Sequence, residues 1–242
     1  MIKIKDLHKS FNSNKVLKGI NLEIKDGETI AIIGRSGCGK SVLIKHIIGL
    51  LKPDKGFVEV EGKIISELSL EELYEIRKIF GFVFQSAALF DSLTVEENVG
   101  LALIENTRMK RSEIKKIVNE KLALVNLYGI NDMKPSELSG GMKKRVGLAR
   151  ALVTNPKYIL YDEPTTGLDP VTSDQIDQLI RDLAKKLNVT SIIVTHDMVS
   201  VRTVADRVAM IHDGMIYYDG SFENFINSND KVIIDFIQRS GY

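Results

Sequence analysis

The sequence predicts an α/β fold built on a mostly parallel sheet. Short apolar, β-branched runs such as residues 29–33, 157–161 and 191–195 are typical of strands that are buried on both faces. Residues 173–187 have the periodicity of an amphipathic helix and lie between two of these runs, so we predict a right-handed βαβ unit. A glycine-rich turn over residues 34–41 joins the first run to an apolar helix.

The N-terminal region predicts an antiparallel β lobe. Apolar and polar residues alternate over residues 1–33, and polar turns interrupt them at residues 12–14 and 26–27. Residues 57–65 alternate in the same way and predict a hairpin, and residues 79–84 predict one more strand.

Helical patterns replace strands between residues 86 and 155. They predict an inserted helical subdomain with helices over residues 95–105, 111–125 and 142–153. Strands resume after the insert, and a hairpin over residues 207–218 is followed by short amphipathic helices over residues 222–239. We expect one domain over residues 1–242, with a catalytic core of residues 1–85 and 156–220, a helical subdomain of residues 86–155 and a C-terminal helical tail of residues 221–242.

Composition limits the possible functions. Hydrophobic residues make up 44% and charged residues 27% of the 242 residues, as in a globular protein with a sizeable core. The 33 lysine and arginine residues nearly balance 32 aspartate and glutamate residues, so no global field favours nucleic acid. One cysteine excludes an internal disulfide and a cysteine zinc cluster. We see no secretory signal and no apolar run near the roughly 20 residues that span a bilayer, so we expect a cytoplasmic protein that works on membranes only through a partner.

Residues 34–41 (GRSGCGKS) fit the phosphate-binding pattern G-x-x-x-x-G-K-[ST] at every fixed position. The glycines let backbone N–H groups approach a phosphate, and the following helix adds the positive end of its dipole. Lys40 would supply charge to the β- and γ-phosphates of a nucleotide, and Ser41 would offer its hydroxyl to Mg²⁺. The alternative is a tight turn with a solvated lysine. We expect nucleotide contacts from Gly34, Arg35, Ser36, Gly37, Cys38, Gly39, Lys40, Ser41 and Val42.

Two side chains in and near this loop have a second interpretation. We expect the Phe11 ring to stack on the nucleotide base with Val16 beside it, but a partly exposed packing phenylalanine is the alternative. Cys38 lies among N–H groups that should lower the pKa of its thiol and favour the thiolate. A buried, inert thiol is the alternative there.

Four predicted strands end in groups that catalysis can use. The phosphate loop follows the first strand, and the others end at Gln85, at Asp162 with Glu163, and at His196. Ligands gather at the carboxyl ends of strands in open α/β sheets, so we expect these groups to converge. Asp162 would hold Mg²⁺, Glu163 would orient or deprotonate an attacking water, and His196 would donate a hydrogen bond to the γ-phosphate. Helix capping is the alternative for Asp162, Glu163 and His196.

A second anion site is predicted inside the helical insert. Ser139, Gly140 and Gly141 precede a basic helix over residues 143–152 and again place backbone N–H groups and a hydroxyl at a helix N-terminus. Because one nucleotide needs only one such cradle, we expect Ser139 to serve the nucleotide of a second copy across a dimer interface. The basic side chains of residues 143–145 are expected on a solvated helix face.

Together these motifs resemble the ATP-binding subunit of an ABC transporter over essentially residues 1–220. The matching motifs are the base-stacking Phe11, the Walker A loop, the Q-loop Gln85, the signature Ser139 to Gly141, Walker B with Asp162 and Glu163, the D-loop Asp169 and the switch His196. The resemblance implies a P-loop NTPase (RecA-like) core and an ATP-sandwich homodimer. It also implies that Lys40, Gln85, Glu163 and His196 are catalytic, that Gln85 helps to hold Mg²⁺, and that Gln85 and the helical insert contact a membrane permease dimer. Met142 stands where the signature usually has Gln, and Phe11 stands where Tyr is commoner.

Within this family, residues 41–53, 89–99 and 138–152 resemble the ATPases of Mla/Mce-type transporters, which move phospholipid between bacterial membranes. This resemblance implies a subunit peripheral on the cytoplasmic face of the inner membrane, a lipid-binding Mce-type partner and no nucleic acid. The ATPase of a polar amino-acid importer is the nearest alternative, because its motifs are the same. A chromosome-maintenance ATPase would need a long coiled coil between its Walker motifs, and a GTPase would need an Asn-Lys-x-Asp element that this sequence lacks.

Overall fold

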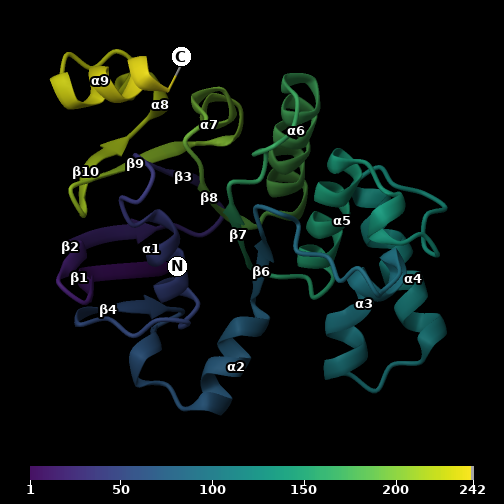
Figure 1. The fold of residues 1–242 in the computed structure, drawn as a ribbon. Helices are drawn as coiled ribbons and strands as arrows, with labels where there is room; N and C mark the ends of the chain where they lie inside the picture. The colour runs from purple at the N-terminus through teal and green to yellow at the C-terminus, as the bar shows by residue number, and fades with distance from the viewer. Residues whose placement is uncertain (241–242) are drawn as a thin grey trace.

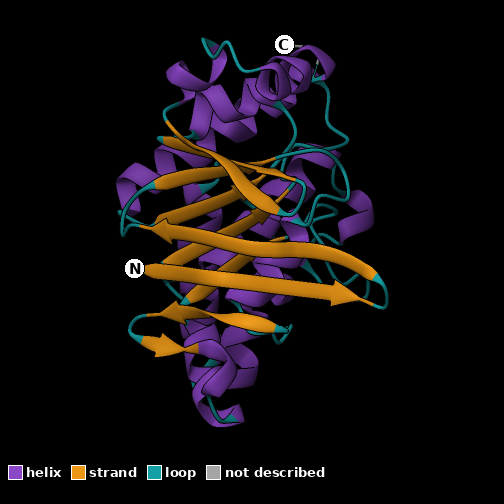
Figure 2. Ribbon diagram, turned by 90° about the vertical axis from the view of Figure 1, so that its left-hand side faces the viewer, coloured by secondary structure: helices purple, strands orange, loops and turns teal. Residues whose placement is uncertain are grey.

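The computed structural model describes residues 1–240, and its strands form two sheets (Figures 1 and 2). The first sheet is antiparallel, with the order β2-β1-β4-β5. Its strands are β1 (Ile2–Phe11), β2 (Asn14–Ile24), β4 (Lys55–Val60) and β5 (Lys63–Ile64). The predicted antiparallel lobe is therefore confirmed, but it does not extend to residue 33. Residues 29–33 are buried throughout and pair in the other sheet, whereas β2 alternates buried and exposed residues.

The second sheet has the order β10-β9-β3-β8-β7-β6, and every neighbouring pair is parallel except β9 with β10. Its strands are β3 (Thr29–Ile33), β6 (Phe80–Val83), β7 (Tyr158–Asp162), β8 (Thr190–Val194), β9 (Arg207–His212) and β10 (Met215–Gly220). The predicted α/β fold is confirmed. Because β3, β6, β7 and β8 run in one direction, their carboxyl ends lie along one edge of the sheet.

The α-helices fall into three groups (Figure 1). Those beside the two sheets are α1 (Lys40–Ile47), α2 (Leu70–Lys78), α6 (Pro170–Leu187) and α7 (Met198–Val204). The helical insert contains α3 (Val95–Asn106), α4 (Arg111–Leu124) and α5 (Gly140–Leu152). One 3-10 helix (Ile65–Glu67) precedes the insert, and another (Pro135–Glu137) lies within it. The tail contains α8 (Phe222–Ile226) and α9 (Lys231–Arg239), and its last residues, 241–242, lie outside the described part. The domain boundaries at residues 85, 155 and 220 stay a prediction. Among residues 1–240, none of the helices has the length and apolar character needed to cross a membrane.

Two helices begin earlier than their apolar periodicity predicts, because polar caps extend them. Helix α5 starts at Gly140, where the Ser139 hydroxyl accepts a hydrogen bond from the Met142 N–H at 3.3 Å. Helix α6 starts at Pro170, where the Asp169 carboxylate accepts a bond from the Thr172 N–H at 3.0 Å. Proline suits this first helical position because its missing N–H would have no partner there.

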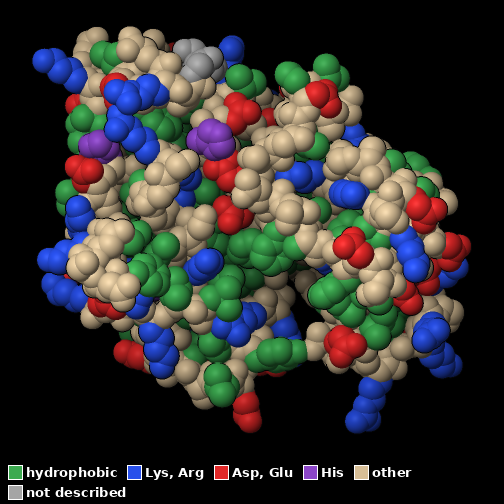
Figure 3. Space-filling model, viewed as in Figure 1, with side chains coloured by type: hydrophobic (Ala, Val, Ile, Leu, Met, Phe, Trp, Pro, Cys, Tyr) green, Lys and Arg blue, Asp and Glu red, His purple; other side chains and the backbone are tan. Residues whose placement is uncertain are grey.

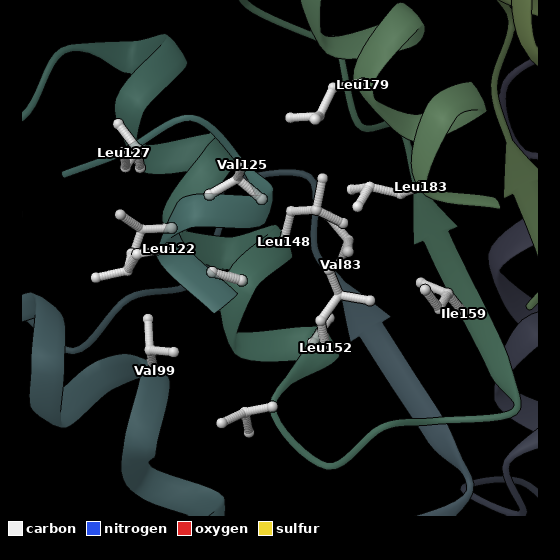
Figure 4. Packing of buried hydrophobic residues seen from close by; sticks show 14 of the residues in the cluster. Val83, Val99, Leu122, Val125, Leu127, Leu148, Leu152, Ile159, Leu179 and Leu183 are labelled. Atoms are coloured by element: carbon white, nitrogen blue, oxygen red, sulfur yellow. The ribbon is translucent and has the colours of Figure 1, made fainter. Parts of the chain in front are cut away.

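Buried apolar side chains join the helical insert to the parallel sheet (Figure 4). Leu148 and Leu152 of α5 belong to one cluster with Val83 of β6, Ile159 of β7 and Val99 of α3. Helix α5 therefore packs against both the insert and the sheet, and close packing of this kind transmits a displacement of one element to its neighbours.

One buried carboxyl group joins α6 to α7. The Asp177 side chain is 3% exposed, and its Oδ2 accepts a hydrogen bond from the Ser200 hydroxyl at 2.6 Å. Its Oδ1 has no hydrogen-bond partner among residues 1–240. Burial raises the pKa of Asp177 to about 7; the Ser200 bond opposes this, and the charges of Asp197 and Asp174 add to it.

We expect Asp177→Asn to flatten the pH dependence of stability. The folded-state pKa exceeds the unfolded value, so the folded chain binds more protons between about pH 4 and 7 and loses stability as pH rises through that window. Between pH 5 and 8 the parent should lose about 2 kcal/mol of unfolding free energy that the asparagine variant keeps, as measured by urea unfolding. Parallel curves for the two proteins would contradict the raised pKa.

Candidate active site

The loop between β3 and α1 has a shape that only glycine allows at its key positions. Gly34, Gly37 and Gly39 have φ of 149°, 79° and 106°. A Cβ on Gly34 would lie 2.5 Å from the Ile211 carbonyl oxygen, and one on Gly39 would lie 2.7 Å from Leu17. No side chain caps the N-terminus of α1, and its first turn has no acidic residue. The first N–H groups of α1 therefore suit an anion.

Lys40 and Ser41 extend this loop toward β7. The Lys40 side chain is buried, and its ammonium donates hydrogen bonds to the Gly34 and Arg35 carbonyl oxygens at 2.8 and 3.2 Å. The Ser41 hydroxyl donates to Asp162 Oδ1 at 3.3 Å. A cation is thus held at the loop beside a hydroxyl and a carboxylate.

The Asp162 carboxylate suits a divalent cation. Burial raises the pKa of Asp162, the Ser41 hydrogen bond lowers it and the charge of Glu163 raises it further, so a bound cation would stabilise the ionised form. Hydroxyl and carboxylate oxygens are ligands that Mg²⁺ prefers. Residues 1–240 contain no group of three or more His, Cys, Asp or Glu placed to hold a metal. Mg²⁺ at this position would therefore take most of its ligands from phosphate and water.

Glu163 is held from three sides. Its Oε1 lies 2.9 Å from Nδ1 of His196, and its Oε2 accepts hydrogen bonds from the Thr166 and Thr195 hydroxyls at 3.2 and 3.4 Å. Its backbone is left-handed, with φ of 51°, and non-glycine residues in this region concentrate at functional sites. The sequence predicted roles for Glu163 and His196 but not this contact, which depends on the pairing of β7 with β8.

The groups predicted to converge line one cavity of about 390 Å³. They come from the phosphate loop, the ends of β6, β7 and β8, and the antiparallel lobe. The lining residues are Phe11, Val16, Ser36, Gly37, Gly39, Lys40, Ser41, Val42, Gln85, Asp162, Glu163 and His196. The structure therefore brings together most of the predicted nucleotide contacts, with Phe11 exposed at the rim.

Arg35 and Cys38 line a neighbouring cavity of about 260 Å³ instead. The Arg35 guanidinium pairs with Asp235 of α9, so the C-terminal tail contacts the phosphate loop. The expectation of a thiolate at Cys38 is wrong. Burial raises the pKa of its thiol and outweighs the nearby Lys40 charge.

The signature residues lie elsewhere. Ser139, Gly140 and Gly141 line a cavity of about 490 Å³ together with Leu168 and Asp169, and this cavity shares no lining residue with the one around Lys40. Their predicted contact with a nucleotide therefore needs another molecule of the chain and stays a prediction.

One functional candidate escaped the sequence interpretation. Lys144 was expected on a solvated face, but its side chain is only 8% exposed and its ammonium donates a hydrogen bond to the Gln85 carbonyl oxygen. Its spacing of three residues from Gly147 and six from Arg150 places all three on one helical face, and this pattern could have indicated a buried contact.

The sequence family described as "ABC transporter" matches residues 17–166. Among relatives, the chain is 44% identical to the "Probable ribonucleotide transport ATP-binding protein mkl" of Mycobacterium leprae over 98% of this chain and 68% of that protein. It is 40% identical to the "Intermembrane phospholipid transport system ATP-binding protein MlaF" of Haemophilus influenzae over 98% of this chain and 90% of that protein. It is 44% identical to the "Methionine import ATP-binding protein MetN" of Clostridium acetobutylicum over 96% of this chain and 72% of that protein.

Solved structures agree with this assignment. A dimeric ATP-binding cassette in a post-hydrolysis state, bound to ADP and phosphate, superposes with a TM-score of 0.83. The two sequences are 37% identical, and the match covers 92% of this chain and 99% of the solved chain. The chain therefore belongs to the ABC transporter family, as an ATP-binding subunit that hydrolyses ATP.

Proposed function

We propose that this chain hydrolyses ATP to drive phospholipid transport between bacterial membranes, from the cytoplasmic face of the inner membrane. The observation that carries the ATPase chemistry is the single cavity in which Lys40, Asp162, Glu163 and His196 meet. The similarity to MlaF over 98% of this chain and 90% of that protein supports phospholipid as the substrate class. The MetN relative keeps a polar amino-acid importer as the second candidate.

The roles follow from position in the cavity. Lys40 and the N-terminus of α1 would bind the phosphates, and Phe11 with Val16 would contact the base. Ser41, Asp162 and Gln85 would hold Mg²⁺, which when bound offsets phosphate charge. Gly34, Arg35 and Cys38 would act by shaping the loop, since none of them lines this cavity.

The hydrolytic step belongs to Glu163 and His196. Glu163 would accept a hydrogen bond from the attacking water and take its proton as the water oxygen bonds to the γ-phosphorus. The bond from that phosphorus to the β–γ bridging oxygen breaks, giving ADP and phosphate. His196 is 59% exposed and could reach a γ-phosphate oxygen while its other ring nitrogen keeps the contact with Glu163.

Two copies would complete two sites. The cavity with Ser139 and the cavity with Lys40 are separate in one chain, so a two-fold symmetric homodimer would place the signature of each copy on the nucleotide of the other. Backbone N–H groups at the N-terminus of α5 would then contact the γ-phosphate from the side opposite Lys40.

A permease dimer would dock at the hollow between α2 and α3. Figure 3 shows hydrophobic side chains gathered around this hollow, and the exposed apolar residues of the surrounding elements include Leu70, Tyr74, Phe84 and Phe90. Residues 87–90 (AALF) form a short apolar stretch soon after Gln85. Within it only Phe90 is an exposed large side chain, because Ala87 is buried and Leu89 packs on the core.

We expect Phe90→Asp to release the subunit from membranes without changing ATP affinity, because Phe90 is 54% exposed and lies outside the nucleotide cavity. Membrane fractionation and nucleotide titration would measure the two effects. Met215→Asp is the control, because Met215 is 49% exposed on the edge strand β10. Equal membrane retention of both variants would remove Phe90 from the docking surface.

The substrate class has its own test. The complex would be purified from membranes through a tag on this chain, and its proteins and extractable lipids identified. A lipid-binding Mce-type subunit with enriched phospholipid is the expected result. A periplasmic amino-acid-binding protein without enriched phospholipid would favour the importer instead.

A further inference from the structure

Helix α5 holds the segment that follows β6 by its backbone. The Lys144 ammonium donates a hydrogen bond to the Gln85 carbonyl oxygen, and the two terminal nitrogens of Arg150 donate to the Ala87 and Ala88 carbonyl oxygens, both at 2.6 Å. Two cationic side chains of one helix thus hold three carbonyls within four consecutive residues. Charge-assisted bonds of this kind are stronger than neutral ones.

The fit between α5 and this segment is close. Gly147 lies midway between the two cationic residues, and a Cβ there would come within 3.3 Å of the Ala87 Cβ. Ala87 itself is 1% exposed. A larger residue at either position would push the segment away from α5.

The held segment has an unfavourable backbone. Ala87 and Ala88 have φ of 61° and 46°, in the left-handed region that residues with a Cβ rarely adopt. Such a conformation persists only where the surroundings impose it. The fork of Arg150 on two successive carbonyls supplies that constraint, and Lys144 extends it to Gln85.

Burying the Lys144 ammonium costs free energy, which its hydrogen bond to the Gln85 carbonyl oxygen offsets. An ammonium loses favourable hydration when it is buried, and burial accordingly lowers the pKa of Lys144, while the charge of Glu163 opposes the shift. The Lys144 side chain therefore links α5 to the Gln85 backbone, and its charge interacts with Glu163, the carboxylate proposed to act on water.

We propose that Lys144, supported by Arg150, is a positioning residue: it fixes the position of Gln85 relative to α5, so that Gln85 moves when α5 moves. The inference rests on the roles proposed above for Ser139 and Gln85. Ser139 caps the N-terminus of α5, and Lys144 lies five residues further along the chain in this helix, roughly 7.5 Å at 1.5 Å per residue. A shift of α5 when Ser139 engages the partner's nucleotide would therefore move the Gln85 carbonyl, and with it the side chain at this subunit's own nucleotide. The contact couples the two sites of the dimer.

Turnover tests the first half of this proposal. Lys144→Met keeps most of the side-chain volume but cannot donate the hydrogen bond, and we expect kcat to fall at least about tenfold with an unchanged Mg-ATP affinity. Lys144→Arg should restore most of the rate, and Lys116→Met, at an exposed site on α4, should match the parent. A Lys144→Met rate within about twofold of the parent, or an arginine variant as slow as the methionine variant, would overturn the proposal.

Hydrogen exchange tests the coupling itself. In the Glu163→Gln background, Mg-ATP should slow amide exchange over residues 84–91, and adding Lys144→Met should abolish this local protection while the ATP-dependent dimer persists. The same protection with and without Lys144→Met would refute the coupling. Gln85→Ala distinguishes a failure of the proposed role of Gln85 from a failure of the proposed role of Lys144. An unchanged kcat in Gln85→Ala would refute the role of Gln85. A reduced kcat in Gln85→Ala with a parental kcat in Lys144→Met would refute only the role of Lys144.

Discussion

Glu163→Gln is expected to bind ATP with parental affinity and to hydrolyse it at least about a hundredfold more slowly, since a positioned general base contributes about 10²–10⁴ in rate. The amide keeps the volume of the carboxylate but cannot accept a proton from water. Lys40, Ser41 and Asp162 remain in the cavity, so nucleotide binding should survive. Single-turnover hydrolysis and equilibrium titration would measure the two quantities separately.

Glu163→Gln should also dimerise when ATP is bound, and analytical ultracentrifugation would detect the dimer. Glu105→Gln is a matched control, because Glu105 is exposed in the helical insert and lies outside both nucleotide cavities. Turnover of Glu163→Gln within about twofold of the parent would remove Glu163 from the mechanism.

A heterodimer that pairs a Lys40→Ala chain with a Ser139→Arg chain is expected to trap nucleotide at one site. If Ser139 acts across the interface, both mutated residues belong to the same nucleotide-binding site and the other site stays intact. A dimer that carries both mutations on one chain should trap almost none, because each nucleotide then meets one lesion.

The two arrangements contain the same mutations, so a general effect on folding cancels between them. Radiolabelled nucleotide retained per dimer is the measurement. Equal retention by the two heterodimers would contradict the two-fold arrangement in which each signature serves the partner's nucleotide.

Local sequence patterns predicted the parts of the fold and site that local physics determines. A buried apolar strand, three glycines and a helix define the phosphate loop, and the backbone of Gly34 and Gly39 has the predicted freedom. Asp162 and His196 line one cavity with the phosphate loop, as the shared direction of the carboxyl ends of parallel strands predicts, and their roles stay a prediction.

Tertiary contacts decided what the sequence could not predict. Lys144 follows polar and basic neighbours and resembles a solvated residue until β6 packs against α5. Arg35 meets Asp235 across 200 residues of sequence, so no local pattern indicates their contact. The Cys38 expectation failed because loop burial, which sequence does not report, outweighs the nearby positive charge.

The most direct measurement is phospholipid movement by the complete membrane complex in liposomes. Mg-ATP is expected to drive labelled phospholipid between the liposomes that hold the complex and acceptor membranes, and a complex with Glu163→Gln is expected to move none. ATP hydrolysis stimulated by a polar amino acid and its binding protein, with no ATP-dependent movement of phospholipid, would contradict the proposed function.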